Sequence, residues 1–264
     1  MEGAWNFRDV ADTTGVRPGL FFRSSELSRL EEDGREVVRR LGITDVADLR
    51  SAREVERRGP GRVPDGVTVH LLPFPDLAAD TDGQSPHEHA FARMMGERPP
   101  TGESVADAAV AYMSEEYRRF PTLPGAQRAV RRVISLLASG RPVITHCFAG
   151  KDRTGFAVAV VLESVGVHRD AILADYLRSN DAVPELRERI VDMMSQRSEA
   201  MPTPEAVTFA EARLTDDVLG VRADYLIEAR RAIDEHYGSL AGFLDAAGVA
   251  DADVDALRAA LIQG

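Results

Sequence analysis

Apolar side chains recur every three or four residues over several stretches of this chain, which is the spacing of an amphipathic helix. The clearest stretch covers residues 126–139 and ends at Gly140, a residue type that commonly stops a helix. Its apolar face is formed by Val130, Val133, Ile134 and Leu137. Further helices are predicted over residues 33–41, 105–120 and 154–165, and throughout the chain from residue 170. The second half of the chain is therefore expected to be largely helical.

Short apolar runs bounded by glycine or proline predict strands in the first 150 residues. They cover residues 21–23, 43–49, 67–74 and 142–145, and the second and third are expected to be core strands. This pattern predicts an α/β fold, in which a central, mostly parallel sheet is flanked by helices. No linker interrupts the pattern, so residues 1–264 are expected to form a single domain.

Residues 76–104 are rich in Asp, Gly, Pro, Ser and His and predict a long loop, with a short helix near residues 91–95. Loops of this length are uncommon in compact domains and often act as functional lids. Three methionines follow in a helical stretch that proline interrupts, and at such positions they usually pack in the core: Met193, Met194 and Met201.

The chain is acidic, with a formal net charge of −11. This charge disfavours nucleic acid and anionic membrane surfaces as partners. No segment approaches the ~18 consecutive apolar residues of a membrane span, and the amino terminus lacks a secretory pattern. We therefore expect a cytoplasmic protein with no stable membrane insertion and no nucleic-acid partner.

Cys147 is the one cysteine of the sequence, which excludes an intramolecular disulfide and a multi-cysteine zinc site. A lone cysteine is often just a small buried apolar residue, so its neighbours decide its role. It follows a predicted strand and precedes a predicted helix, in the run His-Cys-Phe-Ala-Gly-Lys-Asp-Arg-Thr-Gly of residues 146–155. A helix amino terminus carries about half a positive charge and attracts anions. This segment is the candidate site.

The residues between Cys147 and Arg153 can wrap their backbone N–H groups around a phosphoryl group. The groups that would bind such a substrate belong to Phe148, Ala149, Gly150 and Lys151. Arg153 can donate two parallel hydrogen bonds to the same group, and these positive surroundings favour a nucleophilic thiolate on Cys147. The Thr154 hydroxyl can stabilise that thiolate when it leaves. Amides and arginine neutralise the phosphoryl charge, so no metal or other cofactor is expected.

Several further polar residues have structural interpretations. His146 either orders the loop or is an ordinary core histidine. Asp48 and Arg50 are expected to form an internal ion pair. Pocket lining and structural pairing both stay open for Arg8, Asp9 and Arg23.

The pattern His-Cys-five residues-Arg-Thr resembles the signature of the protein tyrosine phosphatase superfamily. The fuller string at residues 149–155 is similar to its bacterial branch of tyrosine, dual-specificity and lipid-capable phosphatases. The resemblance extends over nearly the whole chain, through residues 6–9, 22–25, 42–51 with Glu54, 175–180 and 237–239. It implies a phosphomonoester hydrolase that works through a cysteinyl-phosphate intermediate.

The resemblance leaves two candidates for the general acid that protonates the leaving oxygen. Asp152 lies in the loop, and some members of the superfamily use an aspartate at that place. Asp76 follows Phe74 and Pro75, which is similar to the acid-bearing loop of eukaryotic members, although Pro-Asp is also ordinary turn chemistry. Asp152 is the preferred candidate. Lys151 is expected to add positive charge over the phosphate or to contact a second one.

The substrate is a phosphorylated molecule, for which a phosphoprotein, a phosphoinositide and a phosphorylated metabolite all stay open. An alternative is a phosphate-binding module without catalysis, but such a module typically lacks the cysteine or the acid. A second hypothesis is that the carboxy-terminal helices form a mobile lid over the site.

Overall fold

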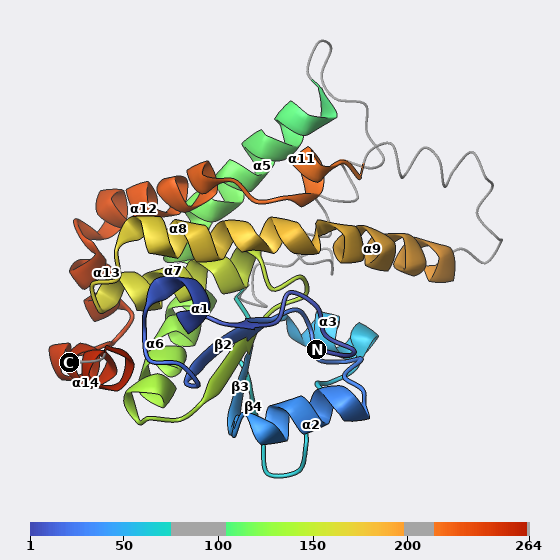
Figure 1. Cartoon of the computed structure of the whole chain (residues 1–264). Helices are drawn as coiled ribbons and strands as arrows, with labels where there is room; N and C mark the ends of the chain where they lie inside the picture. Colours follow the sequence, from blue (N-terminus) through green and yellow to red (C-terminus); the bar gives the residue numbers. More distant parts are fainter. Residues whose placement is uncertain (75–103, 198–213, 263–264) are drawn as a thin grey trace.

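The computed structural model describes residues 1–74, 104–197 and 214–262. Within these ranges five strands form one sheet in the order β1-β2-β5-β3-β4 (Figure 1). Strand β1 is antiparallel to β2, and the other neighbours are parallel, as the sequence predicted. The strands are β1 (Arg8–Asp9), β2 (Phe21–Ser24), β3 (Asp45–Asp48), β4 (Thr68–Leu71) and β5 (Val143–His146).

Successive residues of the central strands bury their side chains on opposite faces of the sheet, as strand geometry requires. One face carries Phe21, Ala47 and Val143 and packs against the larger core. The other face carries Phe22, Val46 and Ile144 and packs in a smaller core with Val38 of the helix over residues 32–40. Burial on both faces explains why these strands read as continuous apolar runs.

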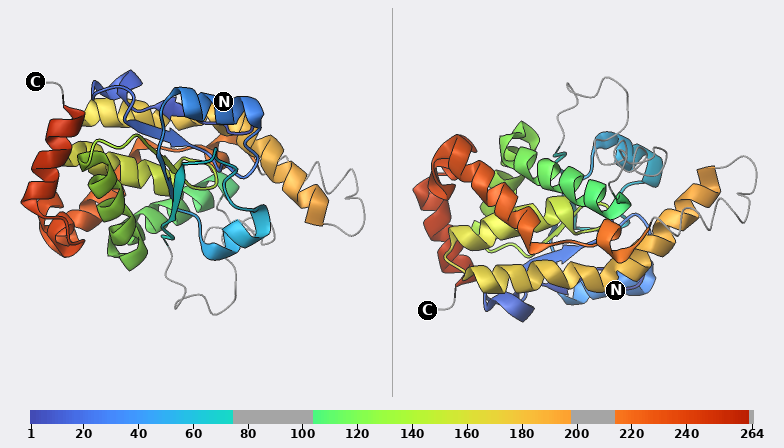
Figure 2. Two further views of the ribbon diagram at one scale, coloured as in Figure 1. Left: turned by 90° about the horizontal axis from the view of Figure 1, so that it is seen from below. Right: turned by 90° about the horizontal axis from the view of Figure 1, so that it is seen from above.

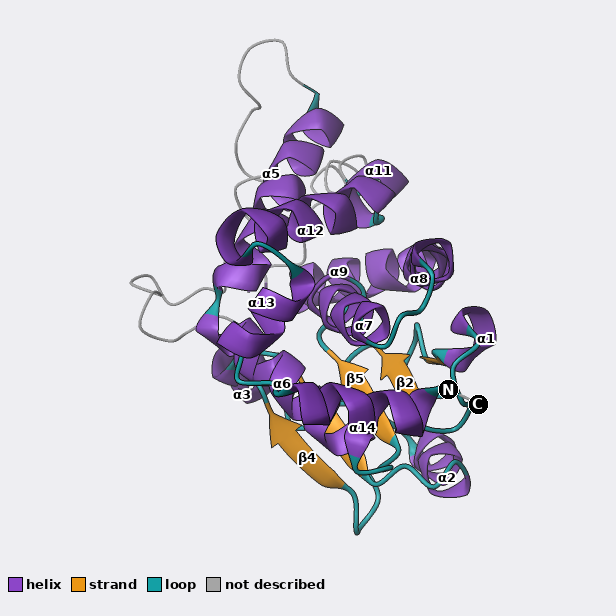
Figure 3. Cartoon of the chain, turned by 90° about the vertical axis from the view of Figure 1, so that its left-hand side faces the viewer, coloured by secondary structure: helices purple, strands orange, loops and turns teal. Residues whose placement is uncertain are grey.

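Helices account for most of the remaining chain. The larger core includes buried residues of α7, α8, α12, α13 and α14, whereas α9 and α11 contribute to a separate cluster. Figure 3 shows the arrowheads of β2 and β5 pointing toward α7, α8 and α9. Helices α5 and α12 pack against each other above them (Figure 2). The described α-helices are α1 (Ala11–Thr14), α2 (Glu32–Arg40), α3 (Ala52–Arg58), α5 (Val105–Arg119), α6 (Pro124–Ala138), α7 (Asp152–Ser164), α8 (Arg169–Leu177), α9 (Val183–Arg197), α11 (Asp216–Leu219), α12 (Ala223–Tyr237), α13 (Leu240–Ala246) and α14 (Asp251–Leu261).

Two details differ from the sequence-based expectation. Strand β4 was expected in the core, but it lies at the sheet edge, where Val69 and Leu71 are 39% and 45% exposed. Helix α7 begins at Asp152 rather than near Thr154, because an acidic residue in the first turn suits the positive end of a helix. The helix expected near residues 91–95 lies outside the described residues, as do Asp76 and Met201.

Among the described helices, none combines the length and the apolar character that crossing a membrane requires.

Candidate active site

The segment between β5 and α7 lies at the carboxyl end of the central strand. Hydrogen bonds from other parts of the chain hold the carbonyl groups on its outer side. The side-chain amide of Asn6 donates to the carbonyl oxygens of Ala149 and Gly150, at 3.0 Å each. The Arg23 guanidinium donates to the same Gly150 oxygen at 2.7 Å. Asn6 itself has a φ of 55°, a left-handed conformation that asparagine tolerates better than most residues.

The two preceding carbonyl groups are held in the same way. The backbone N–H of Glu26 donates to the Phe148 oxygen at 2.9 Å. The ring Nδ1 of His146 lies 3.1 Å from the Cys147 oxygen and donates to it, since a carbonyl can only accept. In a planar trans peptide the N–H points away from the C=O. Four successive carbonyls bound on the outside therefore turn the next four N–H groups toward the inside of the loop.

Gly150 is required where the loop turns closest to β2. Its φ is 66°, and a Cβ at this position would lie 2.1 Å from the backbone oxygen of Ser24. Both the left-handed backbone and the lack of space exclude a side chain.

Arg153 is the most firmly held side chain of the site. Its Nη1 and Nη2 atoms donate to the two carboxylate oxygens of Glu54, at 2.6 and 2.8 Å. Nη1 also donates to the Leu49 oxygen at 3.4 Å. A guanidinium has five N–H groups, so the Nε–H and one Nη2–H stay available, and these two form a parallel fork. The guanidinium edge that could bind a phosphoryl group, as predicted, is therefore the one formed by the Nε–H and the second Nη2–H, which Glu54 does not bind.

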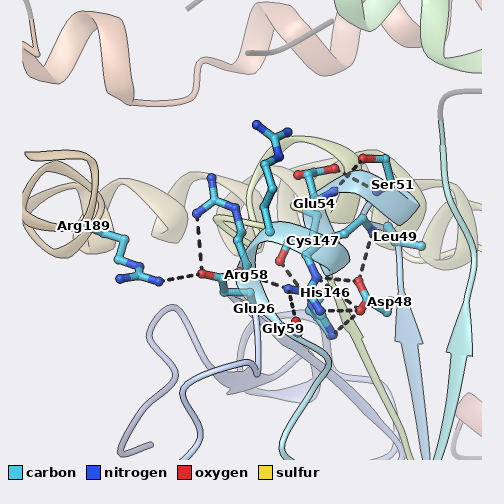
Figure 4. Close-up of polar contacts among 12 residues, drawn as sticks. Glu26, Asp48, Leu49, Ser51, Glu54, Arg58, Gly59, His146, Cys147 and Arg189 are labelled. Carbon is cyan, nitrogen blue, oxygen red and sulfur yellow. Dashed lines mark hydrogen bonds and ion pairs between the residues drawn. The ribbon is translucent and has the colours of Figure 1, made fainter. Parts of the chain in front are cut away.

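Glu54 is itself fixed at the start of α3, where Figure 4 shows it with Ser51. The Ser51 N–H donates to the Glu54 carboxylate at 2.8 Å, and the Glu54 N–H donates to the Ser51 hydroxyl at 3.2 Å. This reciprocal capping box orients the carboxylate toward Arg153. Burial alone would lower the pKa of Arg153, but the Glu54 carboxylate outweighs it and holds the pKa above its ordinary value.

Cys147 and Thr154 lie at the bottom of the loop. The Cys147 side chain is 2% exposed and is the free thiol of the chain. The Thr154 hydroxyl is fully buried and has no hydrogen-bond partner among the described residues. Its one O–H is therefore uncommitted among the described residues, and its role toward the leaving thiolate stays a prediction.

Lys151 contacts α11 in the described residues, and its expected contact to one or a second phosphate stays a prediction. Its Nζ donates to the backbone oxygens of Leu219 and Gly220 at the end of α11, and it lies 3.7 Å from an Asp152 carboxylate oxygen. The carboxyl end of a helix carries partial negative charge, which explains why it attracts this ammonium group.

Asp152 occupies the first turn of α7, with its side chain 16% exposed. The Tyr117 hydroxyl donates to its Oδ1 at 3.1 Å, and the Tyr176 hydroxyl lies 2.7 Å from the Tyr117 hydroxyl. Asp152 is therefore held at the rim of the loop. The competing acid candidate, Asp76, lies outside the described residues.

Helices α9 and α11 cover the outer rim of the loop with apolar side chains. Ala149 belongs to a buried cluster with Val183, Leu186, Ile190, Leu214 and Leu219. Phe148 and Met193 pack against this cluster, which confirms the predicted packing role for Met193. The Arg58 guanidinium stacks on the Phe148 ring, 3.9 Å from its centre. The carboxy-terminal half thus contacts the site, while a lid movement stays a prediction.

The predicted ion pair of Asp48 and Arg50 is confirmed. Arg50 Nη2 lies 2.7 Å from Asp48, and its Nη1 lies 3.0 Å from Glu26. Glu26 also pairs with Arg58 at 3.8 Å and with Arg189 at 3.2 Å (Figure 4). This network connects the ends of β2 and β3 with α3 and α9.

His146 lies next to that network, with Nε2 3.7 Å from Asp48. Burial lowers the pKa of His146, and the Asp48 carboxylate only partly opposes this shift. The ring is fully buried and its Nδ1 holds the loop carbonyl. Both interpretations of His146 therefore apply together: it is a core histidine that orders the loop.

Structural pairing explains the three residues for which pocket lining was the other interpretation. Arg8 and Arg23 both pair with Asp175 of α8, at 2.7 and 2.6 Å. The Asp9 carboxylate accepts the N–H groups of Ala11 and Gly19, at 2.9 and 2.6 Å, and so orders the turn after β1. Arg23 still serves the site through its bond to Gly150.

Sequence reasoning did not assign a role to four residues that support the site. For Glu54 the signal was available, because Ser51 and Glu54 have the three-residue spacing of a capping box. The other three act through contacts between distant segments, for which the local sequence holds no signal: Asn6, Glu26 and Tyr117.

The site combines the Cys147 thiol, a loop whose backbone N–H groups point inward, and the Arg153 guanidinium. This combination defines a cysteine-dependent phosphatase site. A family model described as "Tyrosine phosphatase family" matches residues 1–263. The chain therefore belongs to the tyrosine phosphatase family, whose members act through a cysteine nucleophile, and it is a phosphoric monoester hydrolase of the tyrosine and dual-specificity type.

Known relatives agree over nearly the full length. The "Triple specificity protein phosphatase PtpB" of Mycobacterium tuberculosis is 63% identical over 270 residues, which cover 99% of this chain and 98% of the relative. H16_A0669 of Cupriavidus necator, also named for tyrosine-protein phosphatase activity, is 30% identical, with 98% and 86% covered. A "Tyrosine-protein phosphatase" of Nostoc commune is 24% identical, with 95% and 76% covered.

Proposed function

We propose that Cys147 is the nucleophile and Asp152 the general acid of this phosphatase, within one domain over residues 1–264. The observation that carries the proposal is the outward fixation of four loop carbonyls, which directs N–H groups at the position above the Cys147 thiol. Donors placed in advance around developing charge stabilise a transition state without reorganisation. Arg153 adds its fork on one side of the same position.

The reaction proceeds in two steps. The Cys147 thiolate attacks phosphorus, an Sγ–P bond forms, and the P–O bond to the leaving group breaks while Asp152 gives its proton to the leaving oxygen. Water then attacks phosphorus and gives a proton back to Asp152, and the thiolate leaves, stabilised by the Thr154 hydroxyl. The site returns to its starting state with inorganic phosphate released, and no cofactor takes part.

A phosphorylated protein side chain is the substrate class that we favour, because the relative at 63% identity is named a protein phosphatase. The words "triple specificity" in that name agree with a range of phosphate esters, so phosphoinositides and phosphorylated metabolites, which the sequence left open, stay alternatives within the proposal. Nucleic acid is not a proposed partner, since the net charge of −11 opposes it. The cytoplasm is the proposed compartment, because a catalytic thiol must stay reduced.

Replacing the nucleophile tests the proposal directly. Cys147→Ser should lower hydrolysis of p-nitrophenyl phosphate to below about 1% of wild type, because a serine hydroxyl is far less ionised than a thiol. The fold and the N–H cradle should persist, so inorganic phosphate should still raise the melting temperature of the variant. Substantial turnover by this variant would exclude a covalent intermediate on Cys147.

A second experiment tests the acid. Asp152→Asn should slow p-nitrophenyl phosphate little and slow an alkyl phosphate or phosphoserine peptide by about 10²-fold or more, because only a poor leaving group needs the proton. Asp76→Asn is the matched comparison and should produce the smaller effect. The opposite ranking of the two variants would assign the acid to Asp76.

A further inference from the structure

A pair of buried tyrosines lies directly behind Asp152. Tyr117 on α5 and Tyr176 on α8 are 0% and 1% exposed, and their hydroxyl oxygens are 2.7 Å apart. The Tyr117 hydroxyl reaches the Asp152 Oδ1 atom at 3.1 Å. Hydrogen bonds between the Tyr176 hydroxyl, the Tyr117 hydroxyl and Asp152 Oδ1 therefore connect three helices, α8, α5 and α7.

The rings of this pair are fixed by the packing around them. Tyr117 packs against Tyr225 and Phe120, with ring centres 5.3 and 4.9 Å apart. Tyr176 lies so close to α7 that a Cβ on Gly155 would be 2.7 Å from its ring. Gly155 is therefore needed to admit the Tyr176 ring, and neither hydroxyl can turn away from the line without moving a packed ring.

The direction of the hydrogen bonds follows from which of the three groups can donate, and the Tyr117 hydroxyl is the donor to Asp152 Oδ1. A carboxylate can only accept, so Tyr117 donates its one O–H to Oδ1. The Tyr117 oxygen is then an acceptor, and Tyr176 donates to it. Burial and, next, the charge of Asp152 raise the pKa of Tyr117 well above its ordinary value, and burial does the same for Tyr176. Both phenols therefore keep their protons at neutral pH and act as donors.

We propose that Tyr117 is a positioning residue for Asp152, and that Tyr176 holds Tyr117 in its donating orientation. As long as Tyr117 donates to Oδ1, the proton that Asp152 carries as an acid resides on Oδ2, the oxygen that faces away from the tyrosines. The pair thereby fixes which oxygen delivers the proton. This inference rests on the proposed role of Asp152.

Other ionisable groups also lie near Asp152, and their charges influence the pH dependence of the reaction in every variant. Lys151 Nζ lies 3.7 Å from Oδ2. The remaining groups that interact electrostatically with Asp152 are Tyr112 on α5, Tyr225 on α12 and Arg153 on α7. Replacing a single hydroxyl leaves all of these in place, so a change in the pH profile reports the lost hydrogen bond.

The test compares Tyr117→Phe and Tyr176→Phe with Tyr237→Phe. Tyr237 is a matched control, because its hydroxyl also joins helices through two hydrogen bonds, to Pro121 and Gln127, but lies away from Asp152. For each variant kcat/KM is measured on p-nitrophenyl phosphate and on phenyl phosphate, and the pH dependence of kcat is recorded. Thermal unfolding shows that each variant is folded.

Tyr117→Phe should reduce the rate on phenyl phosphate about tenfold more than the rate on p-nitrophenyl phosphate, the factor expected for one lost hydrogen bond to a charged group. The alkaline limb of the pH profile should move to higher pH, because the Asp152 carboxylate loses a donor that stabilised it. Tyr176→Phe should show the same changes to a smaller extent, and Tyr237→Phe should show neither.

Two results would overturn the proposal, and they are distinguishable. Equal losses on both esters with an unmoved alkaline limb would give Tyr117 a merely structural role while leaving the proposed acid intact. If Asp152→Asn itself showed no dependence on the leaving group, the proposed acid would be wrong and the inference would fail with it. In the supported case, Tyr117→Phe should add no further loss in the Asp152→Asn background, since the two residues act as one unit.

Discussion

At the scale of single residues, Glu54 shows how one carboxylate can serve two structures. It caps α3 through Ser51 and holds both Nη atoms of Arg153. Glu54 and Arg153 are 3% and 4% exposed, so neither could stay charged without the other at acceptable cost. The fork that Arg153 offers to a phosphoryl group therefore depends on a residue that does not touch the substrate.

Glu54→Gln should separate these contributions. Glutamine keeps the length and one acceptor oxygen, but its amide end opposes Arg153 and leaves a buried guanidinium without a counter-charge. The free energy of unfolding should fall by about 3–5 kcal/mol, and inorganic phosphate should inhibit more weakly because the fork is no longer fixed. Chemical denaturation and phosphate inhibition of p-nitrophenyl phosphate hydrolysis measure the two effects.

The control for this variant is Glu36→Gln on α2. Glu36 also pairs with an arginine, Arg39, at 2.9 Å, but the carboxylate is 62% exposed and the pair is solvated. Exposed pairs contribute little, so stability should change by less than about 1 kcal/mol. If Glu54→Gln matched this control in both measurements, Arg153 would be held by the loop itself and not by Glu54.

The residues of the loop could be predicted from the sequence because their spacing is local. Cys147 and Arg153 bracket a turn whose chemistry is evident from seven consecutive positions. The partner of Arg153 could not be predicted in this way, since Glu54 is 99 residues away and reaches it only once β3 and β5 are neighbours. The contacts of Lys151 could not be predicted for the same reason, because α11 supplies its acceptors from 68 residues further along the chain.

At the scale of elements, hydrophobic spacing predicted the type of most helices and strands. The hydrophobic spacing could not predict which strands are central and which lie at the edge, because a short apolar run in the sequence is compatible with either position in a sheet. Strand β4 carries Val69 and Leu71 like a core strand, yet β3 is its one neighbour in the sheet of the described residues. The strand order is set by the crossover helices, which the local pattern does not determine.

The elements around the loop also differ in how they hold it. The segment before β1, strand β2 and the turn after β2 supply the donors Asn6, Arg23 and Glu26 to the loop carbonyls. Helices α9 and α11 instead cover the loop with apolar contacts to Ala149 and Phe148. Directional hydrogen bonds to the loop carbonyls thus fix the orientation of the backbone N–H groups. The apolar contacts of α9 and α11 cover the loop but are not directional, so they do not orient any single group.

At the scale of the whole molecule, Asp175 connects the amino-terminal strands with the helical half. Its two oxygens pair with Arg8 of β1 and Arg23 of β2, and Arg8 also donates to the Asp175 backbone oxygen at 2.7 Å. Burial, and then the nearby Arg23, lower the pKa of Arg8 to about 10, so it is still charged at neutral pH. One buried carboxylate therefore compensates two buried arginines at the junction of the fold.

This junction should make stability depend on pH with a defined sign. Burial raises the pKa of Asp175, but Arg23 and Arg8 outweigh it, so the folded pKa lies below the ordinary value. A depressed carboxyl pKa contributes stability that is complete above the unfolded pKa of about 4 and is lost as the pH falls through the folded pKa. Asp175→Asn removes that contribution and leaves two arginines without a counter-charge, which should cost about 3–5 kcal/mol at pH 7.

The experiment is urea unfolding of wild type, Asp175→Asn and Asp170→Asn between pH 7 and pH 3. Asp170 is the matched control, because it lies in the first turn of the same helix with its side chain 86% exposed. The stability difference between wild type and Asp175→Asn should be constant down to about pH 4 and shrink below it, as wild type loses the charge that the variant never had. Asp170→Asn should stay within about 1 kcal/mol of wild type throughout. A difference that is as large at pH 3 as at pH 7 would mean that Asp175 contributes through its shape and hydrogen bonds and not through its charge, and the two halves of the molecule would then not be joined electrostatically.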